Sequence, residues 1–148
     1  MKLFRELKLS FLFLIFPFVL FAQSKRLHQN KFRKGERNGL WITYSDPTNT
    51  IIETKGRFRK GNEKGVWIYY DKEGKRRKKE VYRFRKIRTT EYNPDGSIQC
   101  KGKAKLEIDA KQLHYYRYGD WQHFSNGRLV KITSYDKGKI VEERKISH

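Results

Sequence analysis

The feature that most constrains the fold of this chain is an internal repeat. The stretch FRKGERNGLWITY, residues 32–44, returns 26 residues later as FRKGNEKGVWIYY, residues 58–70. The two copies align two glycines, a tryptophan and a tyrosine, and a less regular third copy at residues 115–127 places Trp121 at the matching position. A fixed period of this length is typical of repeat architectures, in which each unit buries its apolar face against its neighbours.

The repeated units have the composition of β-strands joined by tight turns. Their segments are short and rich in aromatic and β-branched residues. Gly, Asn, Asp and Pro separate them, and these residues suit hairpin turns. No stretch after the first 22 residues has a sustained helical period. We therefore expect an all-β fold, one elongated domain built as an antiparallel β-hairpin repeat sheet, with units at about residues 32–57, 58–80, a degenerate 81–110, and 115–141.

Alternation along the predicted strands indicates which side chains are buried. The tryptophans recur on one face of the units, so we expect that face to form the core. The segment SIQCKGKAKLEID, residues 97–109, alternates most clearly, and its apolar face includes Cys100. A cysteine in that position is expected to be a packed thiol rather than a nucleophile. The repeat glycines are expected to provide turn geometry; they are Gly35, Gly39, Gly61 and Gly65.

The spacing Gly-x-x-x-Gly-x-Trp-x-x-Tyr, followed by a glycine turn and a second strand, resembles the bacterial variant of the MORN repeat (membrane occupation and recognition nexus). The resemblance covers residues 32–74 well, 81–100 partially and 115–141 recognisably. The third copy has Tyr115 in place of the first glycine, and the partial copy lacks the tryptophan. The resemblance implies an elongated sheet of successive hairpins, usually non-catalytic, with roles in protein or lipid-surface interaction. Some bacterial members are proposed antitoxins.

The first 22 residues have the layout of a secretory signal peptide. Three basic residues precede an apolar run at residues 11–22, which is shorter than the roughly 20 residues of a membrane-spanning helix. We expect cleavage after Ala22, with an uncleaved anchor as the alternative. Cleavage would leave residues 23–148 as a repeat domain without a transmembrane span. That domain would be periplasmic, associated with the cell envelope or secreted.

The chain carries a formal net charge of +19, and the positive charge is concentrated in its middle. Between Lys72 and Lys103 there are twelve Lys or Arg residues and four acidic ones. In the segments GRFR and VYRFR, Phe58, Tyr82 and Phe84 alternate with arginines, so strands in one sheet would carry the arginines on a single face. The candidate anion-binding or partner-binding residues are Arg57, Arg59, Arg83, Arg85, Lys75, Arg76, Arg77, Lys78 and Lys79.

This basic character predicts a non-enzymatic binding protein. Outside the cytoplasm the expected partner is an acidic protein or an anionic envelope component, lipopolysaccharide or phospholipid. Nucleic acid is not the expected partner, because export removes the usual targets. Two alternatives stay open. The cations could form a solvated face that protects sheet edges, or the chain could be the toxin-neutralising or immunity-type protein that the resemblance suggests, with Tyr69 or Tyr44 as an aromatic anchor.

Patterns for catalysis are weak in this sequence. It has no phosphate-binding glycine loop and no nucleophile elbow. A metal site built from His114, His123 and Asp120 would lack a second cluster of ligands. We therefore expect no catalytic residue, no metal and no cofactor. A hydrolase that uses His114, His123 or Cys100 is the remaining enzymatic alternative.

Overall fold

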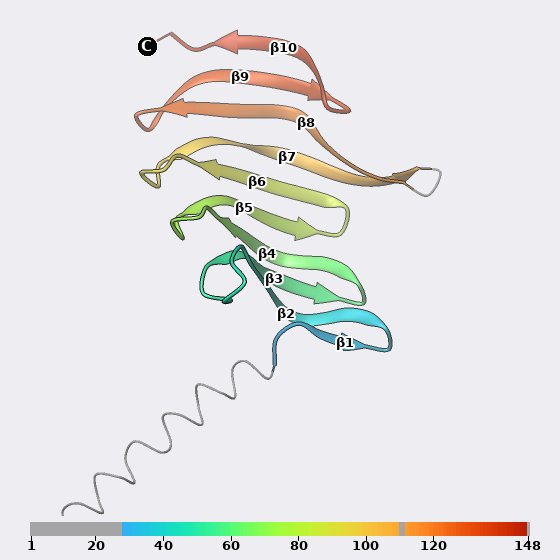
Figure 1. Cartoon of the computed structure of the whole chain (residues 1–148). Coiled ribbons are helices and arrows are strands. Elements are labelled where there is room, and N and C mark those ends of the chain that lie inside the picture. Colours follow the sequence, from blue (N-terminus) through green and yellow to red (C-terminus); the bar gives the residue numbers. More distant parts are fainter. Residues whose placement is uncertain (1–27, 110–111, 148) are drawn as a thin grey trace, which may run out of the picture.

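The computed structural model describes residues 28–109 and 112–147, and these residues form one antiparallel sheet (Figure 1). The predicted signal peptide lies outside the described residues. Each strand pairs with the strand before it and the strand after it in the chain, so the predicted all-β hairpin meander is confirmed. The strands are β1 (Lys31–Arg33), β2 (Glu36–Tyr44), β3 (Ile52–Arg59), β4 (Asn62–Tyr70), β5 (Arg76–Arg83), β6 (Lys86–Tyr92), β7 (Ile98–Asp109), β8 (Gln112–Ser125), β9 (Arg128–Asp136) and β10 (Lys139–Lys145).

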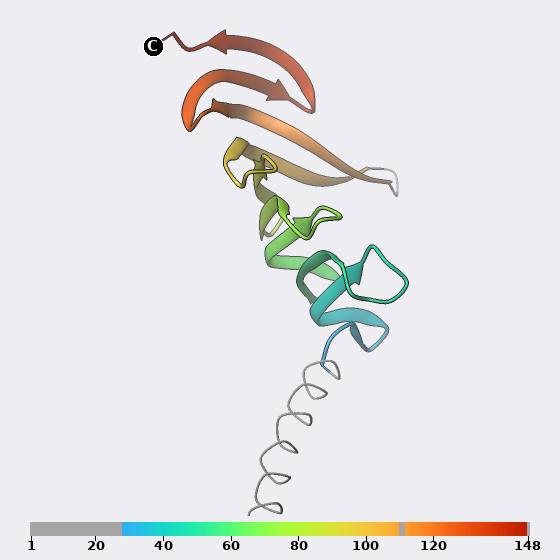
Figure 2. The same ribbon diagram turned by 60° about the vertical axis from the view of Figure 1, so that its left-hand side comes forward.

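The sheet stands as a single layer. In the described part of the chain no helix and no second sheet covers either face (Figures 1 and 2). That part also contains no helix long and apolar enough to cross a membrane. The protein must therefore build its core from side chains that lie along one face of the sheet.

Two-residue turns close the β1–β2 and β3–β4 hairpins, which begin the first two repeat units. Lys34 and Gly35 have φ of +53° and +76°, and Lys60 and Gly61 have φ of +51° and +73°. A positive φ at both central residues is the geometry whose twist matches that of a hairpin. The prediction that Gly35 and Gly61 provide turn geometry is confirmed.

The other two repeat glycines do not lie in turns, and that part of the prediction was wrong. Gly39 and Gly65 lie inside β2 and β4, with φ of +84° and +69°. At Gly65 the register between β3 and β4 shifts, as it does at Gly119 between β7 and β8. Gly119 has a φ of +61°. At these two places the Gly-x-Trp pattern therefore forms a β-bulge, with the tryptophan two residues after the glycine.

Each of these bulges places its tryptophan ring over a glycine of the preceding strand. A Cβ atom on Gly56 of β3 would lie 2.0 Å from the ring of Trp67, and one on Gly102 of β7 would lie 2.4 Å from the ring of Trp121. The exposed fraction is 5% for Trp67 and 0% for Trp121. The prediction that these tryptophans belong to the core is confirmed.

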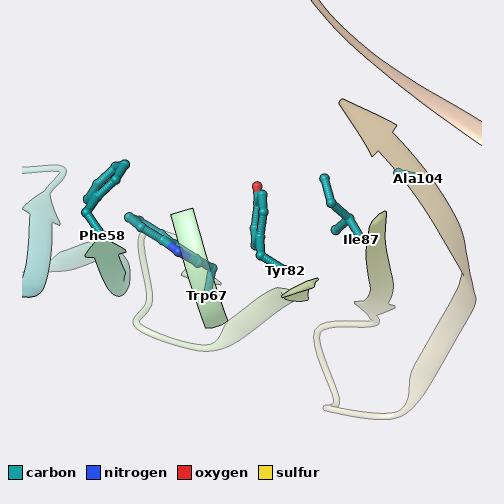
Figure 3. Close-up of a cluster of buried hydrophobic side chains, with 5 residues drawn as sticks. All are labelled: Phe58, Trp67, Tyr82, Ile87 and Ala104. Carbon is teal, nitrogen blue, oxygen red and sulfur yellow. The ribbon is translucent and has the colours of Figure 1, made fainter. Parts of the chain in front are cut away.

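We call the side of the sheet that carries the tryptophans the Trp face. Rings meet edge to face along it, with centroids 5.5 Å apart between Trp41 and Phe58 and 4.9 Å apart between Phe58 and Trp67. Figure 3 shows side chains from successive strands projecting to this same side. The buried apolar cluster consists of Phe58, Trp67, Tyr82, Ile87 and Ala104.

The Trp face is concave in the middle of the sheet. The Tyr115 hydroxyl of β8 donates a hydrogen bond to buried Glu80 of β5, with an O–O distance of 2.8 Å. Three strand spacings separate these strands, roughly 14 Å along a flat sheet. The two side chains meet by reaching toward each other over β6 and β7, and the Tyr115 hydroxyl also lies 3.3 Å from the Thr89 hydroxyl of β6. The opposite face is therefore convex.

Burial of alternate residues was predicted correctly within strands and wrongly at their ends. Cys100 and Ala104 of β7 are 3% and 0% exposed, as predicted, whereas Ile108 near the tip of the β7–β8 hairpin is 67% exposed. Phe84 was predicted to point inward with Tyr82, but it is 90% exposed. The reason is that β5 ends at Arg83, and Phe84 begins the turn to β6, where strand alternation no longer applies.

Candidate functional site

Many Lys and Arg side chains project from the convex side of the sheet, and we call this surface the basic face. Trp67 pairs with Glu80, and Glu80 pairs with Thr89, so these residues share the Trp face and the alternate residues of their strands share the other. In strands β3 and β7 the side chains alternate between the same two faces. The basic face consists of Lys55, Arg57, Lys64, Lys79, Arg83, Lys86, Arg88, Lys101, Lys103 and Lys105.

The acidic side chains of β5 and β6 point away from the basic face, whereas Glu107 near the end of β7 lies on the same face as Lys105. Glu80 and Glu91 are the acidic residues of β5 and β6, and both lie on the Trp face. Each is already paired there, with Lys78 at 3.0 Å and with Arg117 at 2.9 Å. Within the described residues, no ion pair involves a cation of the basic face.

Cations stand directly opposite one another across neighbouring strands of the basic face. Lys86 of β6 pairs with Arg83 of β5 on one side and with Lys105 of β7 on the other. Arg88 of β6 pairs with Lys103 of β7. Like charges opposite each other destabilise a sheet by roughly 0.2–1 kcal/mol per pair. An anion over these pairs would remove that repulsion.

The nine predicted binding residues do not lie on one surface of the protein. Arg57, Lys79 and Arg83 belong to the basic face. Arg59 and Arg85 lie near the hairpin turns and line a groove described below. Because Arg85 belongs to the turn after β5, the prediction that it shares a strand face with Arg83 was wrong.

The five cations from Lys75 to Lys79 were predicted to sit at a hairpin, but β5 begins at Arg76 and contains four of them. Arg76 lies over the ring of Tyr92 at 4.1 Å, and Arg77 is the extra residue of a bulge. Lys78 was wrongly assigned to the basic surface. Its ammonium lies on the Trp face, 3.0 Å from a Glu80 oxygen and 4.0 Å from the centroid of Tyr69.

Sequence reasoning missed part of the basic face. Lys86, Arg88 and the three lysines of β7 were not among the predicted residues, although Lys101, Lys103 and Lys105 alternate visibly with apolar residues. The missing information was the register, which places Arg88 beside Lys103 and Lys86 beside Lys105.

A buried polar cluster around Glu80 was also missed. Its carboxylate accepts hydrogen bonds from the hydroxyls of Tyr69 (2.7 Å), Tyr82 (2.9 Å) and Tyr115 (2.8 Å). Burial would raise the pKa of Glu80, but the Tyr69 hydrogen bond, the charge of Lys78 and the Tyr115 hydrogen bond outweigh it and lower that pKa. Tyr69 is thus an internal hydrogen-bond donor on the Trp face, and its role as an aromatic anchor for a partner stays a prediction.

The residues considered for hydrolysis do not supply an activated nucleophile. Burial and the nearby Glu91 carboxylate raise the pKa of the Cys100 thiol to about 12, so the thiol stays protonated at neutral pH. His123 pairs with Cys100 across the strands, while His114 pairs with Glu107 and projects from the other face. The described residues contain no group of three or more His, Cys, Asp or Glu side chains that could hold a metal ion.

An apolar groove lies on the Trp face, near the turns that follow β3 and β5. It encloses about 790 Å³. The floor consists of Phe58, Tyr82, Leu106, Ile108 and Leu113, from β3, β5, β7 and β8. The rim carries Arg37, Arg59, Phe84 and Arg85, with Glu63 as its acidic member, and Lys64 adds to the lining although it pairs with Arg57 of the basic face. We call this feature the apolar groove.

Comparison of the chain with protein families, with curated proteins and with solved structures found no match.

Proposed function

We propose that this chain is a non-enzymatic, exported binding protein of MORN-like build, whose basic face engages an anionic surface of the cell envelope. The observation that carries the proposal is the set of four cross-strand cation pairs, Arg57 with Lys64, Arg83 with Lys86, Lys86 with Lys105, and Arg88 with Lys103. These pairs cost stability in the free protein and become favourable when anions lie over them.

The shape of the basic face supports a surface rather than a small molecule as the ligand. Its cations are spread over the strands from β3 to β7 on the convex side rather than gathered around one point. Each Lys or Arg close to an anionic membrane contributes about 1 kcal/mol of attraction, and this attraction is screened by salt.

The proposal is tested with the chain lacking residues 1–22 and vesicles of phosphatidylglycerol and phosphatidylcholine, compared with vesicles of phosphatidylcholine alone. The central variant changes Lys86, Arg88 and Lys103 to Ser. We expect it to bind anionic vesicles about 100-fold more weakly, since three contacts of about 1 kcal/mol are lost. Binding of the parent protein should weaken as salt is raised.

A matched control removes the same charge elsewhere. Arg128, Lys139 and Lys145 lie in β9 and β10, outside the basic face, and are exposed. Changing these three residues to Ser should weaken binding several-fold less than the central variant. Equal losses in the two variants would mean that only net charge matters, and equal retention on both kinds of vesicle would refute the proposal.

A further inference from the structure

The apolar groove is a second surface of the molecule, and its apolar side chains are not covered by any other part of residues 28–109 and 112–147. Phe84, Ile108 and Leu113 are 90%, 67% and 65% exposed. The β7–β8 hairpin that carries Ile108 and Leu113 extends past the turns of its neighbours (Figure 1). This extension makes one wall of the groove and enlarges the apolar area beyond what the core needs.

Phe84 occupies a backbone position that favours glycine. Its φ is +58°, at the first central residue of the turn between β5 and β6. The turns after β1 and β3 hold Lys34 and Lys60 at this first position with a similar positive φ, so only Phe84 places a bulky ring there. The ring is 90% exposed, and the Arg85 guanidinium lies 5.7 Å from its centroid. A bulky ring held in a strained and exposed turn is a feature of binding sites rather than of cores.

The rim of the apolar groove is positively charged. Arg37, Arg59 and Arg85 line it, and Glu63 is the acidic side chain among its lining residues. Within the described ranges none of these three arginines takes part in an ion pair. Arg37 lies 5.1 Å from the centroid of Phe58, which holds its charge beside the apolar floor.

From this arrangement we infer that the apolar groove binds an acidic protein segment that carries bulky apolar side chains. The apolar side chains of the segment would fill the floor between Phe58 and Leu113, and its carboxylates would pair with the rim arginines. The groove lies on the concave side and the basic face on the convex side, so a membrane that covers the basic face does not fill the groove. The protein would thus hold a second partner while it is attached to the surface.

A displayed library of random peptides of about twelve residues tests the inference, with the chain lacking residues 1–22 as bait. Selection should enrich peptides that combine Asp or Glu with Phe, Trp, Leu or Ile. An enriched peptide, labelled and measured by fluorescence anisotropy, should bind at least tenfold more weakly to the variant with Phe84→Gly and Leu113→Ser. Both side chains are exposed, so the fold is expected to persist, and far-ultraviolet circular dichroism checks it.

Three outcomes would overturn the inference. They are enrichment of no peptide, enrichment of peptides without acidic residues, and peptide binding that survives in the groove variant. Vesicle binding separates this inference from the proposed function. The groove variant should bind anionic vesicles like the parent protein, whereas the variant of Lys86, Arg88 and Lys103 should keep its peptide affinity within a few-fold. If the groove variant loses vesicle binding instead of peptide binding, the groove is part of the membrane surface and the inference is wrong.

Discussion

Replacing Gly102 by alanine tests how the tryptophans are held in a sheet without a second layer. The new methyl carbon would stand 2.4 Å from ring atoms of Trp121, where carbon atoms normally keep about 3.5–4.0 Å. The ring must therefore move by more than about 1 Å. Such overpacking costs about 1–3 kcal/mol. The Trp121 indole nitrogen also donates a hydrogen bond to the Lys103 carbonyl oxygen at 3.0 Å, and distorting it costs up to about 1 kcal/mol more.

An opposing effect acts on the unfolded chain. Gly102 does not have a positive φ, so alanine fits its backbone and would by itself stabilise the protein by about 0.4–1 kcal/mol. The balance is a loss of about 2 kcal/mol in the free energy of unfolding for Gly102→Ala. Urea unfolding followed by far-ultraviolet circular dichroism measures this loss.

The double variant with Trp121→Leu shows whether the ring is the cause. Without the indole the same Gly102→Ala change should cost nothing or stabilise slightly, so the two substitutions should couple by about 2 kcal/mol. Gly56→Ala, measured with and without Trp67→Leu, should repeat the pattern, because a Cβ there would lie 2.0 Å from the Trp67 ring. A neutral Gly102→Ala variant, or an equal cost in both backgrounds, would refute this account of the core.

Three further predictions follow from single side chains. Phe84→Gly should raise the free energy of unfolding by about 0.5–1 kcal/mol in urea titrations, because glycine tolerates the φ of +58° and the exposed ring has little packing to lose; a loss of stability would show that the ring packs in the free protein. Glu80→Gln should lower the free energy of unfolding by about 2–4 kcal/mol at pH 7, because the buried Glu80 carboxylate accepts hydrogen bonds from three tyrosine hydroxyls and forms an ion pair with Lys78. The folded pKa of Glu80 is lowered, so its contribution is present above the unfolded pKa of about 4.3 and is lost as pH falls through the folded pKa; the acid limb of the pH profile should therefore be shallower in the variant. Cys100, with its pKa raised to about 12, should react with a thiol reagent at pH 8 only after denaturation, and rapid labelling of the native protein would contradict its burial.

The period of the sequence predicted the strands well because hairpin signals are local. Turn residues such as Gly35 and the alternation around Cys100 act within a few positions, and tertiary contacts did not override them. Gly65 was misplaced because a positive φ suits a bulge as well as a turn, and only the partner strand distinguishes the two. The sequence indicated a residue with positive φ at that position, but it did not indicate whether this residue lies in a turn or in a strand.

The candidate surfaces were less predictable, because they depend on which strands are neighbours and where each strand ends. The pairing of Arg88 with Lys103 depends on the register between β6 and β7, and the exposure of Phe84 depends on β5 ending one residue earlier. The Glu80 cluster joins β5 to Tyr115 of β8, which is 35 residues away in the chain. No periodicity within one unit carries that information.

The bridge from Tyr115 to Glu80 also has a consequence for how the protein unfolds. A meander of sequential hairpins can lose strands from either end while the remaining strands stay paired. The bridge opposes this in the middle, since β5 cannot separate from β8 without breaking the hydrogen bond from Tyr115 to buried Glu80. We therefore expect amide hydrogen exchange to be slowest in β5–β8 and fastest in β1 and β10, so that the central strands form one cooperative unit and the terminal strands open first.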